Sequence, residues 1–237
     1  MSHTDHEWVQ CRDPACRLRF PAPVAARAGL GCPACGGVLD GDGPRAAGPG
    51  TASKVVDEVD RGAPVPSPLP AGVVVAGLLD NVRSVLNVGA ILRTADAAGL
   101  AHVHLAGITA RGDHDRIDKT ALGAQHAVAW SHHPDGPAVV ADLQASGWQV
   151  WALEEGGDAE PLARASAQLH ARAGLDARAA PDSARIVVVV GHEVAGVDPA
   201  ILAAADRHVA IPMRGTKRSL NVSIAFGIAV YSLTTSA

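Results

Sequence analysis

Four cysteines are the first residues whose types and spacing indicate chemistry. They stand at Cys11, Cys16, Cys32 and Cys35, in the pattern C-x4-C-x15-C-x2-C. Two thiolates from each of two tight turns can surround one Zn²⁺ tetrahedrally, as in a zinc ribbon. Four unrelated thiols or two disulfides are the alternatives, and the absence of a secretion signal disfavours disulfides. Because four cysteines leave no open position on the metal, we expect this Zn²⁺ to be structural and not catalytic.

A glycine turn after a run of valines, VVVVGHEVAG at 187–196, is a second candidate site. A strand that runs into such a turn is typical of nucleotide-binding loops, but Glu193 stands where a dinucleotide loop has its second glycine. A carboxylate at that place would repel a pyrophosphate. A zinc-protease helix is also excluded, because Gly196 occupies the position of the required second histidine. The turn therefore predicts a ligand without a pyrophosphate.

Two further polar segments follow apolar runs in the same way. They are NVRSVLNVGAILRTADAAG at 81–99 and IPMRGTKRSLNVSIA at 211–225. In a parallel sheet the carboxyl ends of the strands lie along one edge, so the loops at 81–89, 191–196 and 212–221 would converge. We expect the ligand site in the crevice between them.

The elements that must position these loops alternate between strand and helix. Apolar runs predict strands at 72–79, 102–108, 148–153, 185–190 and 207–212. Helical periodicity predicts helices at 88–99, 137–147, 199–206 and 221–233. Such alternation predicts a mostly parallel sheet with helices on both faces. The Ala- and Arg-rich segment 164–184 is interpreted as an inserted partial helix or a loop.

Composition sets the domain organisation and excludes some classes of protein. The chain has 237 residues, 48% of them hydrophobic, which suffices for one full core and a small module. A net charge of -4 excludes a surface that is basic throughout, but it leaves room for a local basic patch. The aliphatic runs are too short to cross a bilayer, so we expect a cytoplasmic protein with no membrane partner. We predict a zinc-ribbon-like module at 1–40, a Pro- and Gly-rich linker at 41–70 and the main domain at 71–237.

The three loops resemble the three motifs of the SpoU (TrmH) family of RNA ribose 2'-O-methyltransferases. The first motif corresponds to residues 81–95 with Asn87 and Arg93, the second to 191–196 with Glu193, and the third to 211–223 with Ser219 and Asn221. KTALGA at 119–124 is similar to a further family segment. The motifs occur in order, which is far more specific than a single glycine pattern. The cysteine module is not part of the family's core pattern.

The resemblance implies an α/β fold of the SPOUT type, a mostly parallel sheet with a deep trefoil knot, to which the small zinc ribbon is added. It implies that S-adenosyl-L-methionine binds between the last two motifs, held largely by backbone groups. The cofactor-binding residues expected from it are Gly191, Glu193, Gly196, Ile211, Pro212, Met213, Ser219, Leu220 and Asn221. A cationic sulfonium tolerates a carboxylate in the turn. Whether Glu193 contacts the ligand or braces the turn stays open at this point.

The resemblance also implies the catalytic residues, which are Arg93, Asn87, Ser219, Asn221 and Glu193. In the family the arginine at the position of Arg93 is held to activate the 2'-hydroxyl, and a second subunit helps to complete the site, so a homodimer is expected. A guanidinium is a poor general base, so we expect Arg93 to orient the nucleophile and to stabilise developing negative charge. A helix-surface arginine lying along apolar neighbours is the alternative.

A basic patch at these loops favours RNA, either tRNA or rRNA, as the partner. The expected RNA-binding residues are Arg83, Arg93, Arg214, Lys217 and Arg218. A solvated charged loop is the alternative. Two other functions stay open: a knotted module that binds cofactor or RNA without turnover, and a dinucleotide-dependent oxidoreductase. The presence of Asn87, Arg93 and Ser219 disfavours the first, and Glu193 disfavours the second.

Overall fold

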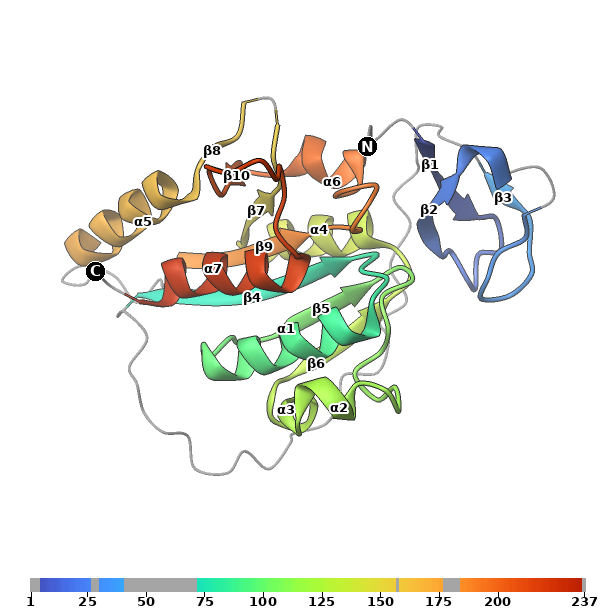
Figure 1. Cartoon of the computed structure of the whole chain (residues 1–237), viewed down its shortest axis with the longest axis horizontal. Coiled ribbons are helices and arrows are strands. Elements are labelled where there is room, and N and C mark those ends of the chain that lie inside the picture. Colours follow the sequence, from blue (N-terminus) through green and yellow to red (C-terminus); the bar gives the residue numbers. More distant parts are fainter. Residues whose placement is uncertain (1–4, 27–29, 41–71, 157, 177–183, 236–237) are drawn as a thin grey trace.

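The described residues of the chain form two separate β-sheets. The computed structural model describes residues 5–26, 30–40, 72–156, 158–176 and 184–235, so the predicted linker at 41–70 lies outside the described residues. A three-stranded antiparallel sheet lies in the N-terminal module, and a seven-stranded sheet lies in the main domain (Figure 1).

The main sheet places the carboxyl ends of its strands along one edge. Its order is β6-β5-β4-β9-β7-β10-β8, and its neighbouring strands pair in parallel. The strands are β4 (Val73–Asp80), β5 (Val103–Ala106), β6 (Trp130–His133), β7 (Gln149–Leu153), β8 (Glu160–Pro161), β9 (Ala184–Val190) and β10 (Arg207–Ala210). The predicted parallel sheet is therefore confirmed.

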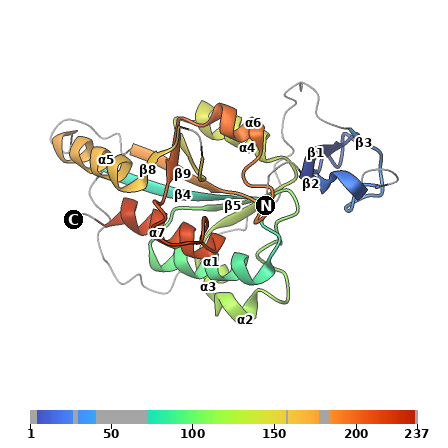
Figure 2. The same cartoon turned by 45° about the horizontal axis from the view of Figure 1, so that its top comes forward.

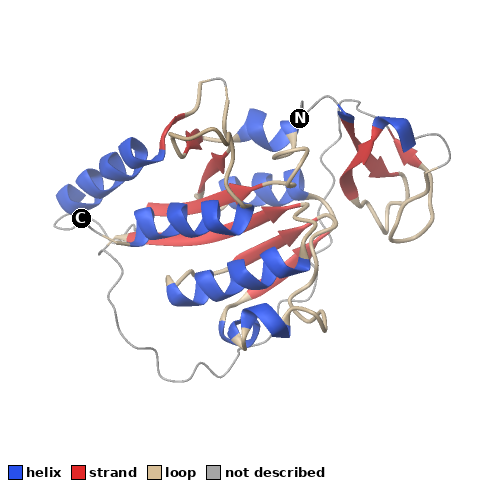
Figure 3. Ribbon diagram, viewed as in Figure 1, coloured by secondary structure: helices blue, strands red, loops and turns tan. Residues whose placement is uncertain are grey.

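Helices cover both faces of this sheet, as Figure 3 shows. They are α1 (Val85–Ala97), α2 (Asp118–Ala121), α3 (Ala124–Ala127), α4 (Gly136–Ala145), α5 (Leu162–Asp176), α6 (Pro199–Ala204) and α7 (Val222–Thr234). Buried residues of α1, α5 and α7 pack on one face, and those of α4 and α6 pack on the other. None of the helices in the described ranges is long and apolar enough to span a bilayer.

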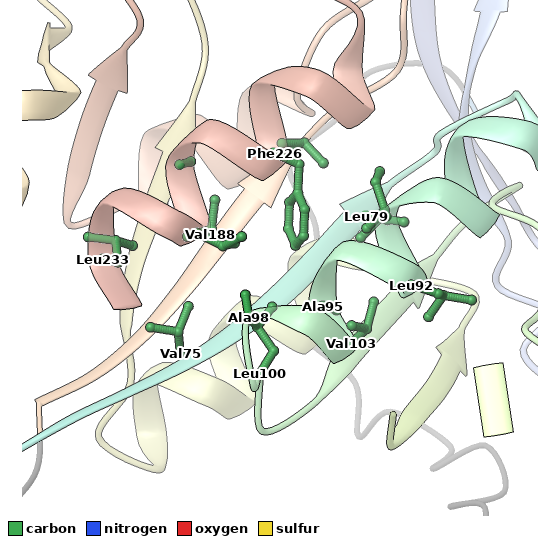
Figure 4. Close-up of a cluster of buried hydrophobic side chains, with 14 of the residues drawn as sticks. Val75, Leu79, Leu92, Ala95, Ala98, Leu100, Val103, Val188, Phe226 and Leu233 are labelled. Carbon is green, nitrogen blue, oxygen red and sulfur yellow. The ribbon is translucent and has the colours of Figure 1, made fainter. Parts of the chain in front are cut away.

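Strand β4 shows how the alternation of side chains builds two cores from one apolar run. Val75 and Leu79 belong to the core under α1 and α7, whereas Ala76 and Leu78 belong to the core under α4. Between them, a side chain on Gly77 would come within 2.9 Å of the ring of Phe226, which fills this space from α7 (Figure 4). The glycine in this run therefore makes room for the last helix against the sheet.

The N-terminal module has a small core of its own and packs against the main domain. Its strands are β1 (His6–Cys11), β2 (Arg19–Pro23) and β3 (Leu39–Asp40). The short helix η2 (Val24–Ala26) directly follows β2 in the chain. Val9, Phe20 and the half-buried Ile108 of the main domain share one apolar cluster. Figure 1 shows the module beside the carboxyl ends of β4 and β5.

The observed elements differ from the predicted ones in places. The first helix begins at Val85 and not at residue 88, because Ser84 caps it and its Oγ accepts a hydrogen bond from the Asn87 amide. Strand β6 was not predicted. For the segment 164–184, interpreted as an inserted partial helix or a loop, the structure bears out the partial helix: α5 runs from Leu162 to Asp176 and buries Leu162, Ala165 and Leu169. Residues 177–183 lie outside the described residues.

Candidate functional site

Glu193 joins the second loop to the start of α1. Its carboxylate accepts hydrogen bonds from the backbone amides of Arg83 (2.9 Å) and Ser84 (3.1 Å) and from Asn87 Nδ2 (3.0 Å). Amides at a helix start lack partners within the helix and lie at the positive end of its dipole. Burial by itself would raise the pKa of Glu193, but these hydrogen bonds hold the pKa below its usual value. Glu193 thus braces the turn with both carboxylate oxygens.

Asn87 connects all three predicted loops. Its Nδ2 donates to Glu193, and its Oδ1 accepts from Asn221 Nδ2 at 3.0 Å. Asn221 in turn caps α7, because its Oδ1 accepts from the amide of Ser223 at 2.8 Å. The loops predicted to converge are therefore held together by one chain of side-chain hydrogen bonds.

A pocket of about 780 Å³ opens between the second and third loops. Such a volume suits a small-molecule ligand, for which pockets of roughly 300–1,000 Å³ are usual. Of the predicted residues, Gly191, Glu193, Gly196, Ile211, Met213, Arg218, Ser219, Leu220 and Asn221 line it. Among the described residues, its lining does not include Pro212, Asn87, Arg83, Arg93, Arg214 or Lys217. Arg93 lies on the exposed side of α1, and Arg214 and Lys217 are exposed on the loop after β10.

The turn at 191–197 is narrow because two glycines let the backbone fold back on itself. His192 and Gly196 exchange two backbone hydrogen bonds, of 2.9 and 2.8 Å. A Cβ on Gly191 would lie 2.3 Å from Gly196 C and from Val197 N. Gly196 has a φ of +77°, which favours glycine. A Cβ at this position would also collide with the carboxylate of Glu154. This backbone-lined wall is the shape expected for a ligand held by main-chain groups.

Sequence reasoning missed Glu154, which lines the pocket from the end of β7. Its Oε2 accepts a 2.7 Å hydrogen bond from the Val197 amide, so it supports the end of the turn. The sequence does indicate this residue, because Glu154 and Glu155 directly follow the strand predicted at 148–153. Because that strand is parallel to β9, its carboxyl end had to lie at the same edge.

The neutral side chain of His192 stabilises the turn by accepting hydrogen bonds from two of its backbone amides. Its Nδ1 accepts from the amides of Val194 (3.1 Å) and Ala195 (3.0 Å), which a protonated ring nitrogen could not do. Burial lowers the pKa of His192 to about 4. Since this lies below the usual value near 6.5, the stabilisation is complete above about pH 6.5 and is lost as the pH falls toward 4.

We predict that His192→Asn makes the protein less sensitive to acid. The amide oxygen of asparagine can accept the same hydrogen bonds and does not titrate in this range. Between pH 7 and pH 5, the melting temperature of the wild type should fall by a few degrees more than that of the variant. Thermal unfolding at several pH values measures this difference. Parallel curves for the two proteins would show that His192 does not carry the effect.

The four cysteines come together in the N-terminal module. Their sulfur atoms all lie within 4.8 Å of one another, with Cys11 and Cys35 3.4 Å apart and Cys16 and Cys32 3.6 Å apart. The amide of Gly37 lies 3.4 Å from the Cys35 sulfur, as a donor toward a metal-bound thiolate would. Four thiols at one point form a donor set that fits a tetrahedral Zn²⁺.

The chain matches one family of RNA-modifying enzymes over most of its main domain. A model of the SpoU rRNA Methylase family matches residues 74–231. The 23S rRNA (guanosine(2553)-2'-O)-methyltransferase RlmP of Bacillus subtilis is 32% identical over 158 residues, which are 66% of this chain and 56% of that protein. The tRNA (guanosine(18)-2'-O)-methyltransferase of Aquifex aeolicus is 30% identical over 156 residues, 64% of each chain.

A solved structure agrees with these relatives. The AdoMet-bound rRNA methyltransferase from Sinorhizobium meliloti is 25% identical and has a TM-score of 0.56, covering 70% of this chain and 57% of that one. This chain therefore spans between half and two thirds of the length of these three proteins.

Proposed function

The chain belongs to the SpoU rRNA methylase family, and on this premise we propose that it transfers a methyl group from S-adenosyl-L-methionine to a ribose 2'-hydroxyl in structured RNA. The observation that carries the proposal is the hydrogen-bonded chain from Glu193 through Asn87 to Asn221, which joins the three family motifs beside one pocket. The two relatives named above act on 23S rRNA and on tRNA, which favours rRNA or tRNA as the substrate.

The pocket suits this ligand because backbone surrounds it. The turn at 191–197 approaches too closely for a side chain on Gly191, so main-chain groups can face the ligand directly. When bound, S-adenosylmethionine supplies a methyl group on a sulfonium, which is already a good leaving group. The residues of this chain therefore have to bind and align. Arg218, Ser219 and Asn221 line the pocket.

The nucleophile needs a group that orients it, and we assign this role to Arg93. A guanidinium can hold a ribose hydroxyl and the adjacent phosphate together and can stabilise negative charge as the proton leaves. Arg83, Arg214 and Lys217 are exposed near the loops and would contact RNA phosphates. We further propose the deep trefoil knot typical of SPOUT folds for the main domain, residues 71–237, and the cytoplasm, where tRNA and rRNA are modified, as the location.

Methyl transfer to RNA tests the proposal directly. The purified chain is incubated with methyl-labelled S-adenosylmethionine and total RNA from cells that lack the gene, and digested RNA is analysed for 2'-O-methylated nucleosides. We expect label in one such nucleoside, and much less label with RNA from cells that carry the gene. Cofactor binding without any RNA methylation would favour the non-catalytic module, and selective binding of NAD would favour the oxidoreductase.

We propose that Cys11, Cys16, Cys32 and Cys35 bind one structural Zn²⁺ per chain. The convergence of their sulfur atoms supports this, since a closed set of four thiolates is the usual donor set of a structural zinc site. Elemental analysis of protein purified without chelator should give about one zinc per chain, and Cys32→Ser should bind less. Protein that contains no zinc and has four readily titratable thiols would contradict the assignment.

We propose a homodimer that uses the outer surface of α7 and the start of α1. Ile224, Ile228 and Tyr231 follow one another at helical spacing on α7, and they are 55%, 41% and 43% exposed, which excludes an ordinary core role within the chain. Leu86 on α1 is 51% exposed, and Figure 2 shows α1 and α7 side by side. Exposed apolar residues grouped in this way are typical of protein interfaces.

Light scattering tests the dimer. The wild type should have the mass of two chains, and Ile228→Asp should shift it toward one chain, because a carboxylate in an apolar interface is costly. Leu122→Asp, at an exposed residue on the α2–α3 turn, is the matched control and should leave the mass unchanged. A fully active monomeric wild type would contradict a shared site.

A further inference from the structure

A buried ion pair joins the cysteine module to the main domain. Arg19, the first residue of β2, extends its guanidinium to Asp198, with hydrogen bonds from Nε to Oδ2 and from Nη2 to Oδ1 (3.0 Å). The side chains are only 8% and 0% exposed. The backbone amide of Arg19 also donates to the Pro134 carbonyl oxygen at 2.9 Å. A surface ion pair contributes little, whereas breaking a buried pair leaves an uncompensated charge.

Asp198 directly follows the turn at 191–197, and its hydrogen bonds fix the position of the turn's last residues. Its Oδ1 accepts from the Ala200 amide at 2.9 Å, which caps α6, and its own amide donates to Asp80 Oδ2 at 2.8 Å. Asp80 is fully buried at the end of β4 and is held by Asn81 Nδ2 at 2.8 Å. Burial, and next the charge of Asp198, raise the pKa of Asp80 to about 7. Two buried carboxyl groups therefore meet here, and Arg19 is a cation beside both.

Other contacts show that the module is closely fitted to this edge of the sheet. A Cβ on Gly107 would lie 2.7 Å from the Arg19 carbonyl oxygen. Gln10 Nε2 donates to Asp135 Oδ2 at 2.9 Å. The ring of His6 lies 5.6 Å from the ring of His192, the residue that holds the turn from within. The module therefore contacts the turn both through Asp198 at its exit and through His192 at its start.

We propose that Arg19 is a positioning residue for methyl transfer: from the cysteine module it holds Asp198, and thereby holds the turn at 191–197 in the conformation that receives S-adenosylmethionine. The inference rests on the proposed function, since it concerns the same pocket. It gives the cysteine module a role toward the cofactor in addition to any role toward RNA. By thermodynamic linkage, cofactor binding would in turn stabilise the docked module.

Calorimetric binding of S-adenosylmethionine to the full chain tests the proposal. Arg19→Met should weaken binding by about tenfold or more, because Asp198 would be buried without its countercharge. Arg12→Met is the matched control: Arg12 pairs with Asp40 within the same module, both exposed, and its loss should leave affinity within about twofold. The double variant Arg19→Met/Asp198→Asn should recover most of the affinity, since asparagine still caps α6 and needs no cation.

Hydrogen exchange of the amides at 191–197, measured without ligand, gives a second readout. Exchange should be faster in Arg19→Met, unchanged in Arg12→Met and restored in the double variant. If Arg19→Met does not fold, Arg19→Lys replaces it, with a smaller loss of affinity because one hydrogen bond is lost and the charge is kept.

The possible outcomes separate this inference from the proposed function. Failure of the wild type to bind S-adenosylmethionine would overturn the proposed function, while the exchange experiment would still support or overturn the role of Arg19. Unchanged affinity and unchanged exchange in Arg19→Met, with a folded module, would overturn the inference and leave the proposed function standing.

Discussion

Replacement of Arg93 by alanine is expected to slow methyl transfer by about 10²–10³-fold while leaving the affinity for S-adenosylmethionine within about twofold. The first effect follows from losing the group that orients the hydroxyl and stabilises its developing charge. The second follows from the position of Arg93, which lies on the exposed side of α1, while the pocket is lined by residues of the second and third loops.

Two measurements decide this prediction. Single-turnover methylation with saturating RNA reports the chemical step, and calorimetry reports cofactor affinity. Arg172→Ala, which removes an exposed arginine from α5, is the matched control and should behave like the wild type. Full activity of Arg93→Ala would remove the proposed role of Arg93, and a parallel loss of cofactor affinity would point to a disturbed pocket.

The strands with continuous, buried apolar runs could be predicted most clearly. The run at 187–190 is buried throughout and gave a clear pattern. Strand β6 could not be recognised in this way, because it reads WSHH and lies at the edge of the sheet. The pattern of α5 left a partial helix and a loop open for a related reason: among the residues of α5 whose burial is described, the buried ones are Leu162, Ala165, Ser166 and Leu169, and they stand among arginines and small residues.

The pocket could be located from the sequence because parallel strands bring their following loops to one edge. The roles of individual residues could not be derived in the same way. Asn87 connects Glu193 and Asn221, which lie 106 and 134 positions away, and nothing in the local pattern around Asn87 specifies either partner. The pairing of Arg19 with Asp198 spans 179 positions. The composition of the predicted linker carried no information on these contacts, which dock the module on the main domain.

The other large expected effect concerns Gly191. Gly191→Ala should weaken S-adenosylmethionine binding by at least about a hundredfold, because the new methyl group would lie 2.3 Å from Gly196 C and Val197 N and would force the turn open. Gly215→Ala is the matched control, since a Cβ at that position meets no atom within 4 Å. Calorimetry measures both variants, and near-wild-type binding by Gly191→Ala would contradict this placement of the pocket.

Mixing two inactive variants then shows which pocket Arg93 serves. If Arg93 completes the partner's site, dimers of one Arg93→Ala chain and one Gly191→Ala chain hold one intact site, because the first chain keeps its pocket and the second keeps its arginine. Random mixing makes about half of the dimers mixed, so co-expression should restore roughly a quarter of wild-type activity. If Arg93 serves the pocket of its own chain, every site lacks either a pocket or an arginine, and the mixture stays inactive. Arg93 is exposed and does not line the pocket of its own chain, which favours restored activity in the mixture.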